Sequence, residues 1–323
     1  MRTTTKRLAA LVLPLALVAG ACGDDDGGDE GAAGSGGGGC DFGEIFTTDG
    51  RIPELELEVV DDPGVFILYN VSLTVPPDIY DQAPEEFEEL TEKLLAPLDN
   101  ETMADLNRQV SAEGEDAADV ADAYLEDQGL TEDLSQLDLS SLDVTVGSKD
   151  FVEQFVLGEI LIAALEAGGA SVTNQVNLGG TSVNRAALES GEIDMYWEYN
   201  GTGWTVHLAQ EDPSDDPDTL TEAVRELDAQ ENSIVWVGQS PFNNTYGFAT
   251  SKEFAESDGP FDLQGMADYL EANESATVCL ETEFPNRPDG LVLFEEATGY
   301  EVPDSQIEIL DTNVIYQETA NNT

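Results

Sequence analysis

Basic residues are scarce in this chain of 323 residues. There are 11 Lys and Arg against 68 Asp and Glu, which gives a formal net charge of -57. Phosphate contacts need many basic side chains, so a basic nucleic-acid-binding surface is excluded, as is docking on anionic lipid headgroups. One His and three Cys leave little material for a metal site or for His-dependent catalysis. We therefore expect no metal, no cofactor and no enzymatic activity, and a protein that works by binding.

Apolar residues are plentiful despite the charge. Hydrophobic residues make up 41% of the chain, which argues against wholesale disorder. The length suffices for two ordinary domains or for one large domain with a sizeable core. No nucleophile motif or paired-carboxylate pattern supports a hydrolase, the enzymatic alternative that so many acids would allow.

The first 22 residues have the pattern of an export signal. Three basic residues precede an apolar run over residues 8–18, which is shorter than a spanning helix of ~20 residues. Residues 19–22, Ala-Gly-Ala-Cys, resemble a bacterial lipobox, in which Cys22 is lipidated and becomes the mature N-terminus, although Ala19 stands where Leu is usual. We predict lipid anchoring at the outer face of the cell membrane. Plain secretion after cleavage near Ala21 is the alternative.

Residues 23–39 consist of Gly, Asp, Glu, Ala and Ser, without a large apolar side chain. Such a segment cannot bury a core, so we expect a flexible acidic tether.

Removal of the signal sharpens the charge imbalance, because residues 1–22 hold three basic residues and no acids. Eight basic residues remain against 68 acidic ones, and repulsion on that scale destabilises a compact chain unless salt screens it. We interpret this composition as that of a protein from a salty habitat. The thermal midpoint is expected to rise from dilute to molar salt, and a flat or falling midpoint would contradict this interpretation.

Two cysteines remain after the predicted lipidation residue. In an oxidising compartment, Cys40 and Cys279 are most simply a disulfide. Two unrelated buried thiols are the alternative.

Strands and helices alternate along the chain, which predicts an α/β architecture with mainly parallel sheets. Before residue 144 we expect strands at 55–60 and 65–71, helices at 85–95, 102–110 and 117–126, and a polar linker at 131–143. After it, strands at 144–146, 171–176, 193–196, 234–237 and 245–249 alternate with helices at 150–167, 181–190 and 219–229.

A series of motifs follows in order from residue 146. It comprises Val-Gly-Ser-Lys-Asp-Phe at 146–151, Leu-Gly-Gly-Thr at 178–181, Gly-Glu-Ile-Asp at 191–194, Glu-Tyr-Asn-Gly-Thr at 198–202, Asn-Asn-Thr-Tyr-Gly at 243–247, and Glu-Phe at 283–284 with Arg287. Over roughly 180 residues this series resembles the start of the substrate-binding proteins of osmoprotectant ABC importers. Those proteins capture glycine betaine, choline, carnitine and similar quaternary amines. The resemblance implies a monomeric solute receptor that delivers its ligand to permease subunits.

In that family a further segment should follow the end of this chain. It would hold a Thr-Asp-Gly-Arg-Ile element, a Tyr-Asn element and a helical tail, and here these stand at the front, at 48–52, at 69–70 and up to Leu130. We therefore read residues 40–323 as a circular permutation, with the old ends joined through residues 131–143. A gene-model artefact, with two partial copies fused or a tandem truncated, is the alternative.

The resemblance also implies the fold. We expect a circularly permuted, two-lobed periplasmic-binding-protein-like (type II) α/β fold that closes at a hinge. One lobe is residues 70–243, and the other combines residues 40–69 with residues 244–323.

Candidate ligand-binding residues come from the same resemblance. It places rings around a quaternary ammonium, which cation–π attraction would hold, and polar groups around a ligand carboxylate. The rings are Tyr69, Tyr199, Tyr246 and Phe46, the last at a position often occupied by Tyr, and the polar groups are Lys149, Thr202 and Arg287. A basic residue kept in so acidic a chain also suggests a specific partner, for which a structural ion pair is the alternative. An acidic cell-surface protein with a decayed or different pocket is the rival function.

Overall fold

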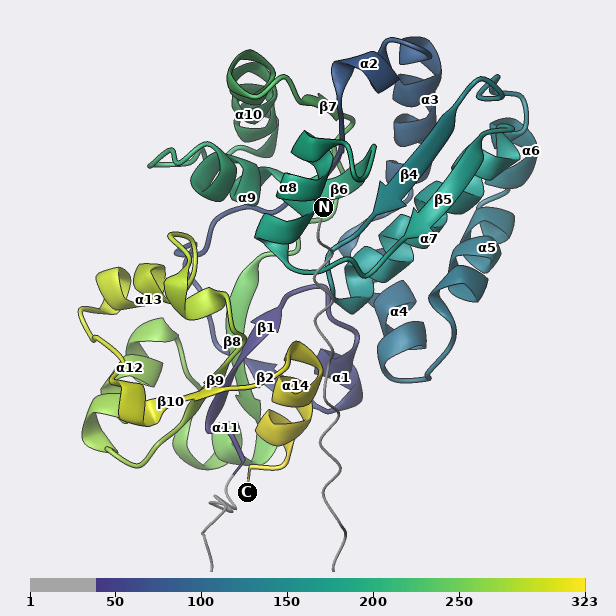
Figure 1. The fold of residues 1–323 in the computed structure, drawn as a ribbon. Helices are drawn as coiled ribbons and strands as arrows, with labels where there is room; N and C mark the ends of the chain where they lie inside the picture. Colours follow the sequence, from purple (N-terminus) through teal and green to yellow (C-terminus); the bar gives the residue numbers. More distant parts are fainter. Residues whose placement is uncertain (1–38, 323) are drawn as a thin grey trace, which may run out of the picture. The chain divides into compact units, whose positions relative to one another are not determined.

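The computed structural model describes residues 39–322 (Figure 1). The predicted signal, the lipidation residue Cys22 and the predicted tether up to residue 38 lie outside the described residues. Within residues 39–322, no helix has both the length and the apolar character needed to cross a membrane.

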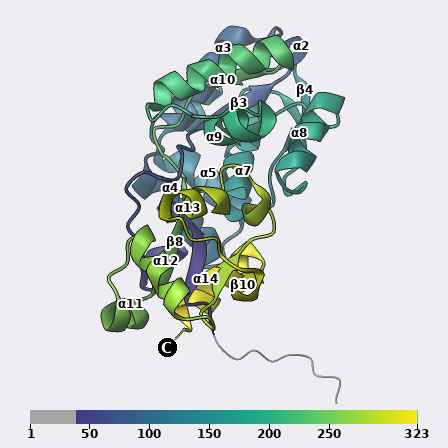
Figure 2. The same cartoon turned by 90° about the vertical axis from the view of Figure 1, so that its left-hand side faces the viewer.

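The largest sheet has five strands in the order β10-β9-β1-β8-β2. They are β1 (Phe42–Phe46), β2 (Leu57–Val59), β8 (Tyr246–Ser251), β9 (Val278–Leu280) and β10 (Ile307–Ile309). The central strand β1 pairs in parallel with β9 and antiparallel with β8, with Phe46 opposite Tyr246. Helix α14 (Thr312–Ala320) packs against β1, β8 and β9 (Figures 1 and 2).

Two smaller sheets contain the remaining strands. An antiparallel sheet has the order β6-β3-β7, and a parallel pair joins β4 to β5. The strands are β3 (Val71–Val75), β4 (Asp143–Gly147), β5 (Ser171–Gln175), β6 (Tyr196–Tyr199) and β7 (Val235–Val237). A parallel bridge from Val146 to Met195 links β4 to the chain just before β6.

Helices cover the sheets and fill the connections. Besides α14 they are α1 (Arg51–Glu54), α2 (Pro77–Tyr80), α3 (Pro84–Leu95), α4 (Asn100–Ser111), α5 (Ala117–Asp127), α6 (Leu130–Leu134), α7 (Val152–Ala167), α8 (Thr181–Ser190), α9 (Asn200–Thr202), α10 (Pro217–Glu231), α11 (Lys252–Asp258), α12 (Leu263–Ala272) and α13 (Leu291–Thr298). Short turns of other helix types are η1 (Gly203–His207), η2 (Phe284–Asn286) and η3 (Asp304–Gln306).

Helix α7 joins the front of the chain to its middle. Ten of its sixteen residues are buried, because it contacts β4 and β5 as well as α4, α5 and α6 (Figure 1). A helix covered on most sides needs little polar surface, which explains its apolar sequence. The helices before residue 143 therefore share a core with the strands after it.

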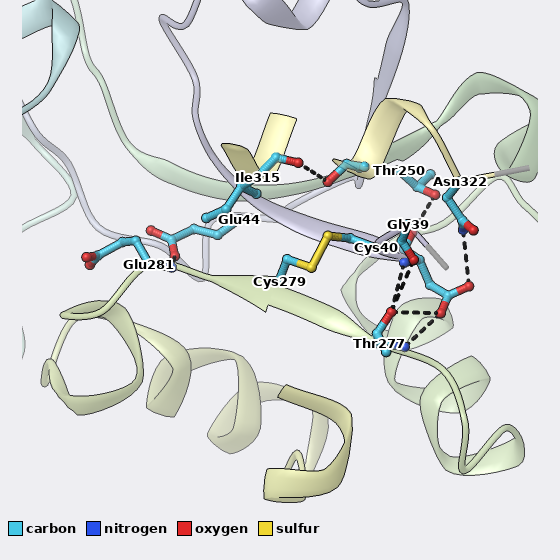
Figure 3. Close-up of a disulfide and its surroundings, with 11 residues drawn as sticks. Gly39, Cys40, Glu44, Thr250, Thr277, Cys279, Glu281, Ile315 and Asn322 are labelled. Carbon is cyan, nitrogen blue, oxygen red and sulfur yellow. Dashed lines mark hydrogen bonds between the residues drawn. A yellow bond between two sulfur atoms is a disulfide. The ribbon is translucent and has the colours of Figure 1, made fainter. Parts of the chain in front are cut away.

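The predicted disulfide is present, and the two ends of the described chain lie together. Cys40 and Cys279 are bonded, with Cα atoms 5.7 Å apart, and both are buried (Figure 3). The Cys40 N–H donates to the Glu318 carbonyl at 3.2 Å, and the Asn322 side-chain amide donates to Asp41 at 3.1 Å. Residues 39–41 thus lie beside residues 318–322.

Two strand predictions were wrong in detail. Residues 65–70 form no strand, because the N–H groups of Tyr69 and Asn70 donate to the side chains of Asn243 and Asn200 rather than to a neighbouring strand. The strand expected at 193–196 begins only at Tyr196.

The sheets are mixed rather than mainly parallel. Within residues 39–322, four strand pairs are antiparallel, namely β1 with β8, β2 with β8, β3 with β6 and β3 with β7. Three are parallel, namely β1 with β9, β9 with β10 and β4 with β5. The antiparallel pairs arise because β3 and β8 each run between strands of opposite direction.

The segment expected to be a polar linker is packed. Residues 130–134 form α6, and four leucines of the segment are buried: Leu134, Leu137, Leu139 and Leu142. The Leu139 N–H also donates to the Gly168 carbonyl at the end of α7, at 3.0 Å. The spacing of these leucines fits neither a helix nor a strand, so no periodic pattern indicated their burial.

Candidate functional site

A cavity of about 370 Å³ lies where several strands end. Its lining includes Phe46 from the end of β1, Tyr199 from the end of β6, Lys149 two residues after β4, and the residues that directly follow β9 and β10. The remaining strands near it run the other way, so Tyr246 stands at the start of β8 and Tyr69 just before β3. Carboxyl ends of strands are the usual place for ligands in open α/β sheets.

Five aromatic rings form a closed circle in the cavity wall. Neighbouring ring centroids are 5.2 Å apart from Phe46 to Tyr246, 5.3 Å from Tyr246 to Tyr69, 6.2 Å from Tyr69 to Tyr199, 6.3 Å from Tyr199 to Phe151, and 5.2 Å from Phe151 back to Phe46. Aromatic rings carry a negative face, so several faces around one space can attract a cation.

All seven predicted site residues line this one cavity: Phe46, Tyr69, Lys149, Tyr199, Thr202, Tyr246 and Arg287. They come from stretches up to 241 positions apart, from Phe46 to Arg287, and only the fold brings them together. Their part in ligand binding remains a prediction. The sequence analysis did not single out Phe151, which completes the circle. It occurs in the motif at 146–151, next but one to Lys149, which was the signal available.

Arg287 is held in a fixed position by acceptors on every side. Its Nε and Nη2 donate to the two carboxylate oxygens of Asp289, both at 2.8 Å. Nη2 also donates to Thr202 at 3.1 Å. Nη1 donates to Thr181 at 3.2 Å and to Glu283 at 3.4 Å. Burial would lower the pKa of Arg287, but this surrounding negative charge raises it, so the group stays charged.

Asp289 is the hub of this arrangement. It is fully buried and also accepts hydrogen bonds from the hydroxyls of Tyr69 at 2.6 Å and Thr205 at 2.8 Å. Asp289, the carboxylate that pairs with Arg287, therefore also orients the Tyr69 ring of the circle. Arg287 itself lies 5.6 Å from the centre of the Tyr246 ring.

Lys149 is likewise paired inside the wall. Its Nζ lies 2.6 Å from the Glu198 carboxylate and 5.2 Å from the centre of the Tyr199 ring. Glu198 is fully buried, and it also contacts His207 at 2.8 Å and accepts from the Tyr196 hydroxyl at 2.9 Å. Burial alone would raise the pKa of Glu198, but Lys149 and His207 hold it well below its usual range. His207 thus contacts the carboxylate of the Lys149–Glu198 ion pair.

Glu153 fixes the ring circle from behind. One carboxylate oxygen accepts from the Tyr199 hydroxyl at 2.8 Å and from Asn244 at 2.9 Å, and the other accepts from Thr48 and from Asn107 at 3.0 Å. Burial raises the pKa of Glu153 despite these four donors. The Glu153 carboxylate therefore connects residues from the first, middle and later parts of the chain next to the cavity.

The scarcity of basic residues does not by itself show which of them belong to a ligand site. All eight basic residues after the predicted signal have an acidic partner within 4 Å, and four of the eight are buried: Arg51, Lys149, Arg185 and Arg287. The structural ion pair that we set out as the alternative is therefore present for Lys149 and Arg287 too. What distinguishes these two is their place in the cavity wall.

A second carboxyl group lies close to the cavity-lining Glu281. Glu44 on β1 is buried and accepts from the Glu281 N–H at 2.9 Å through one oxygen (Figure 3). Its other oxygen has no hydrogen-bond partner among residues 39–322. Burial first, and then repulsion from Glu281, raises the pKa of Glu44 well above its ordinary value.

Glu44→Gln is expected to stabilise the protein at neutral pH. A carboxyl whose pKa is raised by folding carries no penalty below its unfolded pKa, and the penalty grows as pH rises towards the folded pKa. The substitution should therefore add about 1 kcal/mol or more to the free energy of unfolding at pH values well above the unfolded pKa, and little near pH 4. Thermal midpoints across pH 4–8 measure the difference. The exposed Glu58→Gln on β2 is the matched control, and an unchanged midpoint for Glu44→Gln at pH 8 would contradict the burial argument.

The profile of one protein family, described as the substrate binding domain of the ABC-type glycine betaine transport system (OpuAC), matches residues 35–127 and 143–323. This chain belongs to that family. The family is one of substrate-binding domains of transporters and not of enzymes.

Named relatives are similar over part of their length. The glycine betaine-binding protein YehZ of Escherichia coli is 34% identical over 184 residues, which cover 56% of this chain and 60% of YehZ. A glycine-betaine-binding protein of Pseudomonas aeruginosa is 34% identical over 182 residues, 54% of this chain and 58% of its own length. The carnitine transport binding protein OpuCC of Listeria monocytogenes is 25% identical over 182 residues, 55% of this chain and 57% of its length.

Among solved structures, apo YehZ from Escherichia coli aligns with a TM-score of 0.35 at 32% identity, over 52% of this chain and 60% of that one. The chain thus spans about three fifths of the length of the two glycine betaine-binding relatives.

Proposed function

We propose that this chain is the solute-binding subunit of an ABC importer and that it holds a quaternary ammonium solute within the circle of five rings. The circle is the observation that carries the proposal, because a permanently methylated nitrogen cannot lose its charge and is held by ring faces. Three relatives are named for binding glycine betaine or carnitine, which supports this solute class. Lys149, Thr202 and Arg287 would face the polar end of the solute.

The test uses a panel of solutes at molar salt. Isothermal titration with glycine betaine, choline, carnitine, proline betaine and ectoine is expected to give one-to-one binding of at least one quaternary amine, without turnover. The uncharged carbon isostere of choline, 3,3-dimethylbutan-1-ol, is the matched control and should bind far more weakly, because it lacks the charge that ring faces attract. No binding by any member would instead favour the acidic surface protein with a decayed pocket.

The proposed lobes are residues 70–243 and residues 40–69 with 244–323, joined at a hinge. The chain crosses between the proposed lobes near residue 70 and again near residue 243. Hydrogen bonds between these two crossings support a hinge there, because the Asn70 side-chain amide donates to the carbonyls of Ser240 and Phe242, at 3.1 and 2.8 Å. Arg287 of one proposed lobe also donates to Thr181 and Thr202 of the other. Ligand that touches both lobes would stabilise such a closed form and present it to the permease.

The proposed circular permutation rests on three observations. The family profile matches two stretches with a gap at residues 128–142, where the old ends would be joined. Residues 39–41 lie beside residues 318–322, where the old chain would have been continuous. The helices before residue 143 also pack on α7, as parts of one lobe should.

Restoring the supposed original order should leave the protein folded and able to bind. The variant joins Asn322 to Gly39 through a short Gly-Ser segment and opens the chain between Ser135 and Gln136, which are both exposed. Exposed positions with adjacent old ends tolerate such rearrangement. Circular dichroism and the solute titration measure the outcome. An aggregated product that neither folds nor binds would count against the permutation.

We also propose export and lipid attachment through Cys22, with the protein acting as a monomer beside its membrane partners. Mass spectrometry of the mature N-terminus tests the lipid. Cys22→Ser is expected to appear in the medium rather than in the membrane fraction, and equal membrane retention of both forms would contradict the anchor.

A further inference from the structure

The cavity wall provides little free positive charge. Each of the five N–H groups of Arg287 has an acceptor, and the nearest are the two oxygens of Asp289. A ligand carboxylate could reach this guanidinium only by displacing one of them. Arg287 has such a fixed arrangement because its planar fork matches the Asp289 carboxylate in a bidentate pair.

Lys149 has N–H donors left for a ligand, but its positive charge is neutralised by a neighbouring carboxylate. Its ammonium group has three N–H donors, and among residues 39–322 one of them is directed to Glu198 at 2.6 Å. Glu198 is fully buried and charged at neutral pH, so it cancels the charge of Lys149 within the wall. Lys149 can therefore donate a hydrogen bond to a ligand without attracting an anion strongly.

Acidic groups outnumber these two cations around the cavity. Four more carboxyl groups line it, and they are Asp150, Glu281, Glu283 and Asp311. Of these four, only Glu283 touches a basic group within residues 39–322, at 3.4 Å from Arg287, and its other oxygen accepts from the Thr181 N–H at 3.2 Å. With the partners of Lys149 and Arg287 included, six carboxyl groups surround two basic ones. The field in the cavity is therefore negative and attracts cations.

We propose that the solute is a quaternary ammonium cation whose far end carries an uncharged hydroxyl, as in choline, rather than a zwitterion that ends in a carboxylate. This inference rests on the proposed function. A hydroxyl can accept from Lys149 and donate to a carboxylate of the wall, so both kinds of neighbour are satisfied. A carboxylate has only acceptor oxygens and would stand among like charges, which costs binding free energy.

Titration calorimetry of the full chain with choline and with glycine betaine tests the inference. Both ligands share the trimethylammonium group, so their difference reports the far end alone. Choline is expected to bind at least tenfold more tightly. Glycine betaine binding equally well or better would overturn the inference while leaving the proposed function intact. Binding of neither, nor of any other quaternary amine, would refute the proposed function itself.

Glu283→Gln provides a second test. The amide keeps an acceptor for the Thr181 N–H, removes one negative charge and frees an N–H of Arg287. The preference for choline over glycine betaine is expected to fall about threefold or more. Glu256→Gln on α11 removes the same charge from an exposed residue outside the cavity lining and should leave the preference unchanged. Equal preference in the parent and in Glu283→Gln would overturn the assignment of selectivity to the wall charge.

Discussion

Tyr246→Leu is expected to weaken binding of a quaternary ammonium solute about tenfold. The ring of Tyr246 contacts two other members of the circle, at 5.2 Å from Phe46 and 5.3 Å from Tyr69. A cation–π contact is worth ~0.5–2 kcal/mol, with the larger values in sites shielded from water, and tenfold in affinity corresponds to about 1.4 kcal/mol. Leucine keeps apolar bulk at this buried position but has no ring face. Titration calorimetry measures the affinity directly.

Tyr246→Phe is the matched control for this change. Among residues 39–322, no hydrogen bond involves the Tyr246 hydroxyl, so phenylalanine keeps the ring and gives up little else. Its affinity should stay within about twofold of the parent, whereas Leu should differ from both. Equal affinities for Leu and Phe would show that the ring face is not what holds the solute. Thermal melts of both variants separate this result from a loss of folding.

The candidate residues could be named from the sequence because short motifs carry them. Tyr199 and Thr202 belong to one motif, and Lys149 and Phe151 to another, so a family resemblance places them without knowledge of the fold. Phe151 nevertheless went unassigned, since an apolar residue just before a helix usually packs against that helix. Its ring reaches the cavity only because the turn between β4 and α7 points it there.

The charge balance of the site could not be predicted. Lys149 and Glu198 are 49 positions apart, and no local pattern pairs them among 68 acids. Strand direction was missed for a similar reason, because β3 pairs with strands more than 120 positions away and its direction depends on how the chain crosses between the proposed lobes. Pairings at such separations depend on the whole fold rather than on neighbouring residues.

Reduction of the Cys40–Cys279 disulfide is expected to lower the free energy of unfolding by about 2–5 kcal/mol. The bond joins residues 239 positions apart, and a cross-link that closes a long loop restricts the unfolded chain most. It also holds the start of β1, which would otherwise be a free end of the folded part, next to β9. Thermal midpoints with and without reductant, at one salt concentration, measure the loss.

The Cys40→Ser/Cys279→Ser variant is the control for reduction. It should melt at the midpoint of the reduced parent and should not respond to reductant, while an equal midpoint for the oxidised parent would contradict the expected stabilisation. Affinity for solute at low temperature should persist, because β1 keeps its hydrogen bonds to β8 and β9 and so keeps Phe46 in place.

The size of the disulfide effect also depends on the order of the chain. In the variant that joins Asn322 to Gly39, the bond would close a loop of roughly 45 residues plus the added linker, running from Cys279 through the new junction to Cys40. The loop-length dependence then predicts about 1.5 kcal/mol less stabilisation than in the natural order. A smaller response to reductant in the rejoined chain is therefore expected. It would indicate that the disulfide compensates in part for the opening of the chain beside β1.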